Sequence, residues 1–182
     1  MYTGKITIKE TDQSDLPNVM GLWNDGNVMS YVGYPDGLGV TLERLQKWLS
    51  GVNQNMFRRH YSIYADGVGY CGETFYEIDR EHDLARLDIK LMPEARGKGI
   101  AAYAFSYVID QVFSNNLATK ARVDPHPDNK KAWDLYAKLG FISKPRPEFL
   151  EKGLTYMEVT PETFRSACWT TPSGSSGVAG KR

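Results

Sequence analysis

Two glycines within the segment Arg-Gly-Lys-Gly-Ile-Ala, residues 96–101, constrain the fold of this chain more than any other feature of its sequence. The segment follows a strand-like run that ends at Met92 and precedes a helix-like run that begins near Ile100. Glycine has no Cβ, so the backbone here can adopt positive φ angles and approach a ligand closely. The first amides of a helix lack intrahelical acceptors, and the helix dipole favours an anion at that end. With the charges of Arg96 and Lys98, the segment is typical of a phosphate or pyrophosphate cradle.

The composition is that of one globular domain with a sizeable core. The chain has 182 residues, of which 41% are hydrophobic and 12% aromatic. Twenty-two basic residues balance 22 acidic ones, so net charge does not indicate nucleic acid or a membrane surface as a partner. The cysteines and histidines lack metal-ligand spacing, and no apolar run is long enough to span a bilayer. We therefore expect no metal and a cytoplasmic protein.

The hydrophobic pattern predicts an alternation of strands and helices. Strands are expected over residues 5–9, 60–65, 68–76, 84–92, 119–124, 141–143 and 154–159. Helices are expected over residues 14–23, 41–52, 100–112 and 129–139. The first of these would be capped within residues 14–17, and the second by Thr41. The Gly- and Pro-rich segment 24–40 is expected to be a loop that either forms the wall of a pocket or lies in solvent.

The glycine segment also matches the dinucleotide-binding fingerprint G-x-G-x-x-[GA], with Asp124 as a possible ribose-binding acid. Two features disfavour an NAD(P)-binding oxidoreductase. The first strand of such a fold is buried on both faces, whereas residues 84–92 carry Arg86, Asp88 and Lys90. The fingerprint also belongs near the start of its domain, and here several elements come before it.

A second motif lies further along the chain, where residues 129–141 read N-K-K-A-W-D-L-Y-A-K-L-G-F. This N-x-x-A-x-x-x-Y-x-x-x-G-F arrangement, together with R-x-x-G-x-A at residues 96–101, resembles the GCN5-related N-acetyltransferase (GNAT) family. The similarity covers the element order over roughly residues 5–160. It is closest in style to the branch that acetylates ribosomal proteins and small amines.

The resemblance implies an α/β (α+β) fold with a single domain over residues 1–160. Residues 161–182 would form a C-terminal tail, largely disordered from about residue 170, where Thr, Pro, Ser and Gly dominate. The central sheet would be mixed and mostly antiparallel, with about six or seven strands and about four flanking helices. It would splay apart between its fourth and fifth strands, and acetyl-CoA would lie in that opening.

The resemblance also assigns the residues that bind the cofactor. The pyrophosphate would be bound by Arg96 and by the backbone amides of Gly97, Lys98, Gly99, Ile100 and Ala101. Backbone groups of Leu91 and Met92 would pair with the pantetheine arm, and Asn129 would hydrogen-bond the same arm.

Acetyl transfer to an amine requires that the amine lose a proton, because a lysine-like amine with a pKa of about 10.4 is charged at neutral pH. Glu73 and Asp88, on strands expected beside the opening, are the candidate bases, and a water chain or His126 could serve instead. A backbone N–H near Met92 would stabilise the oxyanion. Tyr136 resembles the family's tyrosine that donates a proton or a hydrogen bond to the departing thiolate.

The sequence therefore predicts an acetyl-CoA-dependent N-acetyltransferase that transfers the acetyl group directly to a primary amine. The acceptor could be a small molecule or a protein N-terminal amine, and the enzyme a monomer or a homodimer. A non-catalytic acyl-CoA sensor on the same fold is the alternative hypothesis, since no residue is clearly dedicated as the base.

Overall fold

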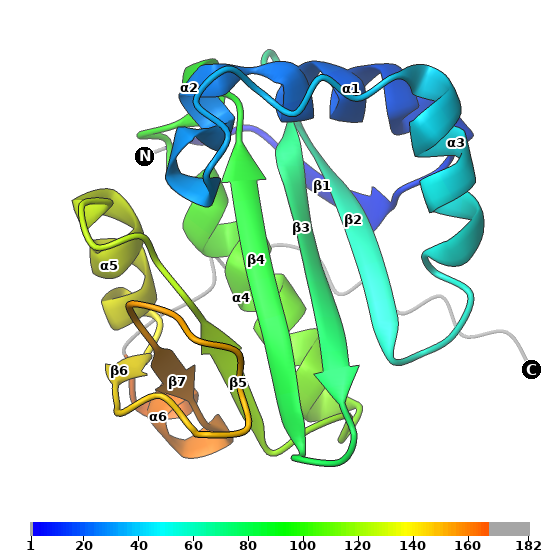
Figure 1. Ribbon diagram of the computed structural model, residues 1–182. Helices are drawn as coiled ribbons and strands as arrows, with labels where there is room; N and C mark the ends of the chain where they lie inside the picture. The colour runs from blue at the N-terminus through cyan, green and yellow to red at the C-terminus, as the bar shows by residue number, and fades with distance from the viewer. Residues whose placement is uncertain (1, 168–182) are drawn as a thin grey trace, which may run out of the picture.

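Seven strands in the order β1-β2-β3-β4-β5-β7-β6 form one sheet in the computed structural model, which describes residues 2–167 (Figure 1). The strands are β1 (Ile6–Glu10), β2 (Arg58–Ala65), β3 (Gly69–Asp79), β4 (Leu84–Leu91), β5 (Lys120–Val123), β6 (Ile142–Ser143) and β7 (Met157–Val159). The helices are α1 (Leu16–Asn24), α2 (Gly26–Met29), α3 (Leu42–Gly51), α4 (Ile100–Ser114), α5 (Lys130–Lys138) and α6 (Pro161–Ser166). No helix in this part of the chain is long and apolar enough to cross a membrane.

The sheet is antiparallel except where β4 pairs with β5, and this parallel pair is short. It runs only from Leu84 opposite Lys120 to Arg86 opposite Arg122. Beyond Arg86, β4 continues to Leu91 while β5 diverges from it (Figure 1). The predicted sheet, with its opening between the fourth and fifth strands, is therefore confirmed.

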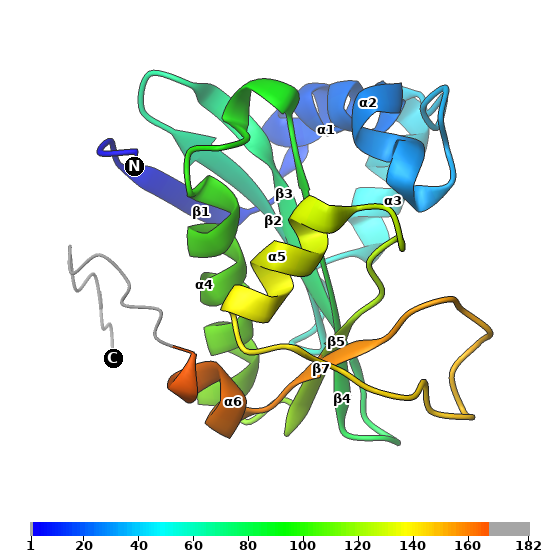
Figure 2. The same cartoon turned by 90° about the vertical axis from the view of Figure 1, so that its left-hand side faces the viewer.

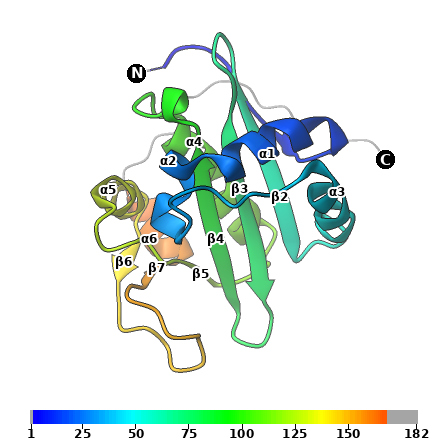
Figure 3. The same ribbon diagram turned by 45° about the horizontal axis from the view of Figure 1, so that its top comes forward.

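Helices cover both faces of the sheet (Figure 2). One face packs on α4, whose buried stripe includes Phe105, Val108 and Val112, in the main hydrophobic core. The opposite face lies under α1, α2 and α3 (Figure 3). Their apolar side chains form two smaller clusters, both of which include Tyr70 of β3.

Local chemistry explains where several helices begin. Thr41 caps α3 by accepting a hydrogen bond from the Arg44 amide, as predicted. The first helix begins where predicted, because Asp15 is the N-cap residue of α1, but the Asp15 side chain makes no cap hydrogen bond to it. It instead forms a capping box with Asp12 around the preceding 3₁₀ turn. Segment 24–40 is not purely a loop, because the Asp25 side chain caps α2.

The additional helices, compared with the expected four, are both short: α2 and α6. In α6, Phe164 packs against Phe113 of α4, with ring centroids 6.4 Å apart. A Cβ on Gly140 would lie 2.3 Å from the carbonyl oxygen of Thr163, so the turn after α5 requires glycine there. Residues 161–167 of the expected tail thus pack on the domain. The disorder predicted from about residue 170 lies outside the described residues.

Candidate active site

Three strands present a polar grid on the face covered by α1, α2 and α3. Directly paired residues of antiparallel strands point to the same face, so the pairing of β2, β3 and β4 defines three rows. The rows of this polar grid are Ser62–Glu73–Lys90, His60–Phe75–Asp88 and Arg58–Glu77–Arg86.

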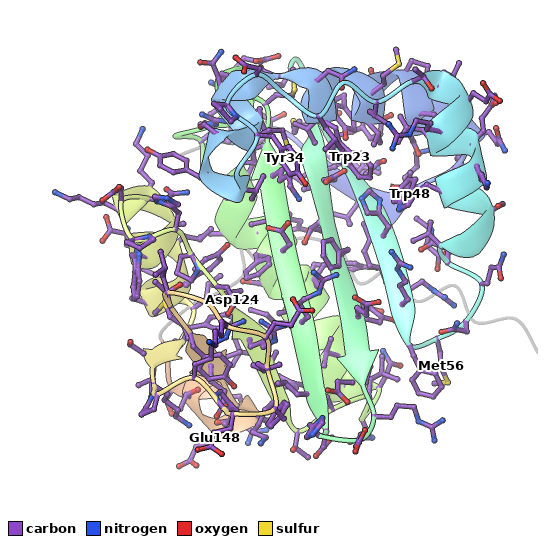
Figure 4. All side chains as sticks on the ribbon, viewed as in Figure 1. Trp23, Tyr34, Trp48, Met56, Asp124 and Glu148 are labelled. Carbon is purple, nitrogen blue, oxygen red and sulfur yellow. The ribbon has the colours of Figure 1, made fainter. Side chains whose placement is uncertain are left out.

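A cavity of about 360 Å³ lies between the polar grid and the helical layer. The helical side of its lining consists of Trp23, Met29, Val32, Tyr34, Trp48 and Val52. The strand side consists of Arg58, Arg59, His60, Glu73, Phe75, Arg86, Asp88 and Lys90. Figure 4 shows the labelled Trp23, Tyr34 and Trp48 over one end of β2, β3 and β4. Of the two alternatives for segment 24–40, the structure therefore favours the pocket wall.

Glu73 lies at the buried end of this cavity, with a side chain that is 1% exposed. Its Oε2 lies 3.0 Å from His60 Nε2, and its Oε1 accepts a hydrogen bond from Trp23 Nε1 at 2.7 Å. Burial opposes ionisation of Glu73, but the charges of His60 and Lys90 and the hydrogen bonds from His60 and Trp23 outweigh it and lower the pKa of Glu73. A carboxylate that is almost fully buried and has a lowered pKa is poorly suited to be a general base.

The position of His60 is fixed by contacts that the sequence does not predict. Thr11 Oγ1 lies 2.8 Å from His60 Nδ1, and the side chain of Asn53 bonds the backbone N–H and C=O of His60. The Trp48 ring packs edge-on against the imidazole, with centroids 4.8 Å apart. A lone histidine in a strand carries no motif, so nothing in the sequence links it to Glu73.

Asp88 is the more accessible of the two candidate bases, with 29% of its side chain exposed. Its Oδ1 accepts from the Ile89 amide at 2.8 Å, and its Oδ2 accepts from the Lys90 ammonium. Although burial disfavours the charged form of Lys90, Asp88 and Glu73 raise the pKa of Lys90, which stays protonated. Asp88 follows Arg86, the last β4 residue paired with β5, so it lies where the cavity meets the opening in the sheet.

Tyr136 lies on α5, on the β5 side of that opening. Its ring packs between Phe105 and Phe141, at centroid distances of 5.3 Å and 5.6 Å. Burial and the nearby charges of Asp88 and Asp124 raise the pKa of Tyr136, so its hydroxyl remains protonated. This hydroxyl makes no hydrogen bond to any other residue within 2–167, which leaves it free to donate.

The glycine segment has the geometry that its sequence predicts. Gly97 and Gly99 have φ angles of 76° and 82°, and no atom lies within 4 Å of a Cβ added at either position. Gly99 is the N-cap residue of α4. Within the described chain, the amides of residues 97–101 donate to no protein acceptor, so they form an open set of donors at a helix N-terminus.

The neighbouring cofactor candidates are partly engaged within the protein. The Arg96 guanidinium donates to the Leu91 carbonyl at 3.1 Å and to the Asn27 carbonyl at 3.3 Å, which ties α2 to the end of β4. The Met92 amide donates to the Cys71 carbonyl at 2.9 Å, so in this structure that amide is not free to bind an oxyanion.

The remaining candidates lie at the start of α5. Asn129 caps α5, because its Oδ1 accepts from the Ala132 amide at 3.2 Å, and its side-chain NH₂ stays unengaged among the described residues. His126 is exposed and packs against Tyr31, with ring centroids 5.6 Å apart, outside the cavity lining. Residues 2–167 contain no group of three or more His, Cys, Asp or Glu side chains placed to hold a metal ion.

The splayed sheet and the open glycine segment that begins α4 are the features of an acetyltransferase. A family model described as "Acetyltransferase (GNAT) domain" matches residues 5–142. The chain belongs to this family, as its two motifs predict.

Individual relatives are more distant. The spermidine N(1)-acetyltransferase of Escherichia coli (strain K12) is 26% identical over 136 residues, which cover 75% of this chain and 72% of that protein. An uncharacterized N-acetyltransferase of Bacillus licheniformis is 23% identical over 146 residues, 78% of this chain and 81% of the relative. The solved structure of spermidine N-acetyltransferase from Vibrio cholerae in complex with CoA and spermine has a TM-score of 0.74 at 23% identity. It covers 88% of this chain and 98% of that one, and the two proteins share a fold.

Proposed function

We propose that this protein transfers the acetyl group of acetyl-CoA directly to a primary amine of a small molecule. One observation carries the proposal: a single strand, β4, leads from Asp88 in the wall of the cavity to the open amides of residues 97–101. A site for an amine and a site for a diphosphate therefore lie along the same element.

The residues at the end of β4 fit the cofactor. Five unengaged amides and the positive end of the α4 dipole suit a pyrophosphate, and the absence of side chains at Gly97 and Gly99 lets it approach. Arg96 and Lys98 add positive charge. Beyond Arg86 the edge of β4 on the β5 side pairs with no strand of the described chain, and this edge and the free NH₂ of Asn129 suit an amide-bearing arm. The Met92 amide and the Leu91 carbonyl are engaged with Cys71 and Arg96 in this structure.

Each proton in the reaction has a group that can handle it. Asp88, directly or through a water, takes the first proton of the acceptor ammonium, and the amine nitrogen then bonds to the acetyl carbon. As the carbon–sulfur bond breaks, the nitrogen loses its second proton, which passes through water to solvent or replaces a proton that Tyr136 has given up. Tyr136 donates a hydrogen bond or its proton to the departing thiolate. Glu73 positions His60, Trp23 and Lys90 around the cavity and takes no proton.

The cavity supports a small acceptor. Its volume of about 360 Å³ lies in the lower part of the range of small-molecule sites. The names of the relatives, which include spermidine N(1)-acetyltransferase, also support a small amine over a protein N-terminus.

Two measurements on the purified chain test the proposal. Calorimetric titration with acetyl-CoA should show saturable binding, and no binding to folded protein would refute the site. Thiol release from acetyl-CoA should then depend on an added primary amine. Binding without release across a broad amine panel would instead favour the acyl-CoA sensor.

A further inference from the structure

We propose that the acceptor amine carries a negatively charged group, bound by Arg58, and is not a polyamine. This inference rests on the proposed function and names the substrate class of the same cavity. It depends on which charges in the cavity wall are paired within the protein.

Both carboxylates that line the cavity are paired. Glu73 contacts His60 and Trp23, and its Oε1 lies 3.4 Å from Lys90 Nζ. Asp88 accepts from the Lys90 ammonium. The reacting ammonium lies at Asp88, the accessible carboxylate, and a polyamine brings a second ammonium. Among the described residues that line the cavity, only the buried and paired Glu73 is then left to receive it. That ammonium would lie among cations, at a cost in free energy.

Arg58, in contrast, is a charged residue of the cavity wall that has no ionic partner in the described chain. It lies at the β2 end of the third row of the polar grid, is half-buried and lines the cavity. In the same row, Glu77 pairs with Arg86 at 2.7 Å. The Arg58 guanidinium forms no ion pair or side-chain hydrogen bond with any residue within 2–167. Its planar fork of donors matches a carboxylate or a phosphate, which would supply the missing partner.

The floor of the cavity is an aromatic ring beside two cations that are each paired with a carboxylate. Phe75, in the middle of the polar grid, lies under two cations: the Arg86 guanidinium is 5.0 Å and Lys90 Nζ is 5.9 Å from its ring centroid. A ligand that crosses Phe75 therefore passes cations on the β4 side and reaches Arg58 on the β2 side.

The grid also sets the shape of the acceptor. Arg58 and Asp88 lie two strands and one row apart, about 12 Å between Cα atoms from the usual strand spacing and rise. An amine at Asp88 and an anion at Arg58 thus need a spacer between them. Trp23 and Trp48, which pack edge to face at 5.0 Å, give that spacer an apolar wall.

Amines of similar length and different charge test the inference. The panel is γ-aminobutyrate, aminopropylphosphonate, butylamine, putrescine and spermidine, assayed by thiol release from acetyl-CoA. We expect kcat/KM for the better of the two anionic amines to exceed that for putrescine by about tenfold to a hundredfold. Carboxylate and phosphonate probes distinguish the two anion chemistries.

Variants locate the effect. Arg58→Gln should lower kcat/KM for the anionic amines to the butylamine level, and Arg58→Glu should reverse the preference in favour of putrescine. Arg44→Gln, on the exposed face of α3, is the matched control and should change neither. Melting curves verify that each variant is folded. If a variant does not fold, the substrate preference of the wild-type enzyme alone tests the inference.

The possible failures are distinguishable. Equal or higher activity on putrescine and spermidine in the wild type, or an unchanged preference in Arg58→Gln, overturns the inference and leaves the proposed function standing. No thiol release with any amine overturns the proposed function. In that case the CoA-saturated protein is titrated by calorimetry: binding of an anionic amine that is lost in Arg58→Gln supports the Arg58 site, and no binding overturns it.

Discussion

His60 Nε2 lies 3.0 Å from Oε2 of Glu73, and the two side chains are only 3% and 1% exposed. Trp23 of α1 donates to the same carboxylate, and Trp48 of α3 packs on the imidazole. The buried pair therefore joins the sheet to the helices that form the other wall of the cavity. The shape of the acceptor site depends on it.

Glu73→Gln should destabilise the fold by about 3–5 kcal/mol at neutral pH, because Lys90 and His60 lose their buried anionic partner. The free energy of unfolding in a denaturant titration measures this loss. Glu81→Gln, at an exposed position in the β3–β4 turn, is the control and should cost less than about 0.5 kcal/mol. Equal losses in the two variants would contradict the buried network.

The same carboxylate predicts a dependence of stability on pH. His60 and Lys90 outweigh desolvation and lower the pKa of Glu73 from 4.5 to about 2 in the folded protein. A lowered pKa means that the stabilisation is present above pH 4.5 and is lost as the pH falls toward about 2. Glu73→Gln should lack this part of the acid dependence. Parallel stability curves for wild type and variant, measured over this pH range, would show that Glu73 is not responsible.

Gly99→Asp should weaken acetyl-CoA binding by two orders of magnitude or more, about 3 kcal/mol, because it places a negative charge among the amides that suit the pyrophosphate. Gly67→Asp is a close control, since Gly67 has a φ angle of 72° against 82° for Gly99 and the same empty space around its Cβ. Calorimetry compares the two. Similar affinities would exclude the glycine segment as the diphosphate site.

Tyr136→Phe should lower kcat by roughly 10²-fold and leave acetyl-CoA affinity and melting temperature near the wild-type values. The reason is that the hydroxyl makes no hydrogen bond within the described residues, while the ring packs on Phe105. Tyr107→Phe removes another phenol without a described hydrogen-bond partner and should have no effect on kcat. Unchanged turnover in Tyr136→Phe would reduce Tyr136 to a packing residue.

Asp88→Asn should lower kcat by roughly 10²-fold with a smaller change in KM, since a neutral amide cannot take the proton of the acceptor ammonium. The loss should shrink as the pH approaches the pKa of the acceptor, where more of the amine is already neutral. Asp110→Asn, exposed on α4, serves as the reference. A loss that is independent of pH would argue against Asp88 as the proton acceptor.

Those parts of the site that depend on local chemistry could be predicted from the sequence. The glycines at 97 and 99 permit the positive φ angles that form the open amides, whatever packs around them. The Thr41 and Asn129 side chains cap the helices that follow them. The alternation along residues 84–92 identified one charged face of β4, which is the face that lines the cavity.

The parts that depend on long-range pairing could not be predicted. Glu73, His60 and Trp23 come from three separate elements, and strand alternation gives the face of a residue but not its partner. The unpaired state of Arg58 is visible only once β2, β3 and β4 are in register. Helix α2 was missed because a single helical turn has no hydrophobic periodicity, and only its Asp25 cap marks it.

The central claim, direct acetyl transfer to an amine, is tested most directly by the initial rate of thiol release from acetyl-CoA with paired acceptors. Each pair consists of a primary amine and its N,N-dimethyl counterpart. The tertiary amine matches the primary amine in charge but has no N–H that can be replaced by an acetyl group. Release with the primary amine and none above background with the tertiary amine, together with isolation of the N-acetylated product, is the predicted result. Equal release with both members of every pair, or no release with any amine while acetyl-CoA remains bound, would contradict the account.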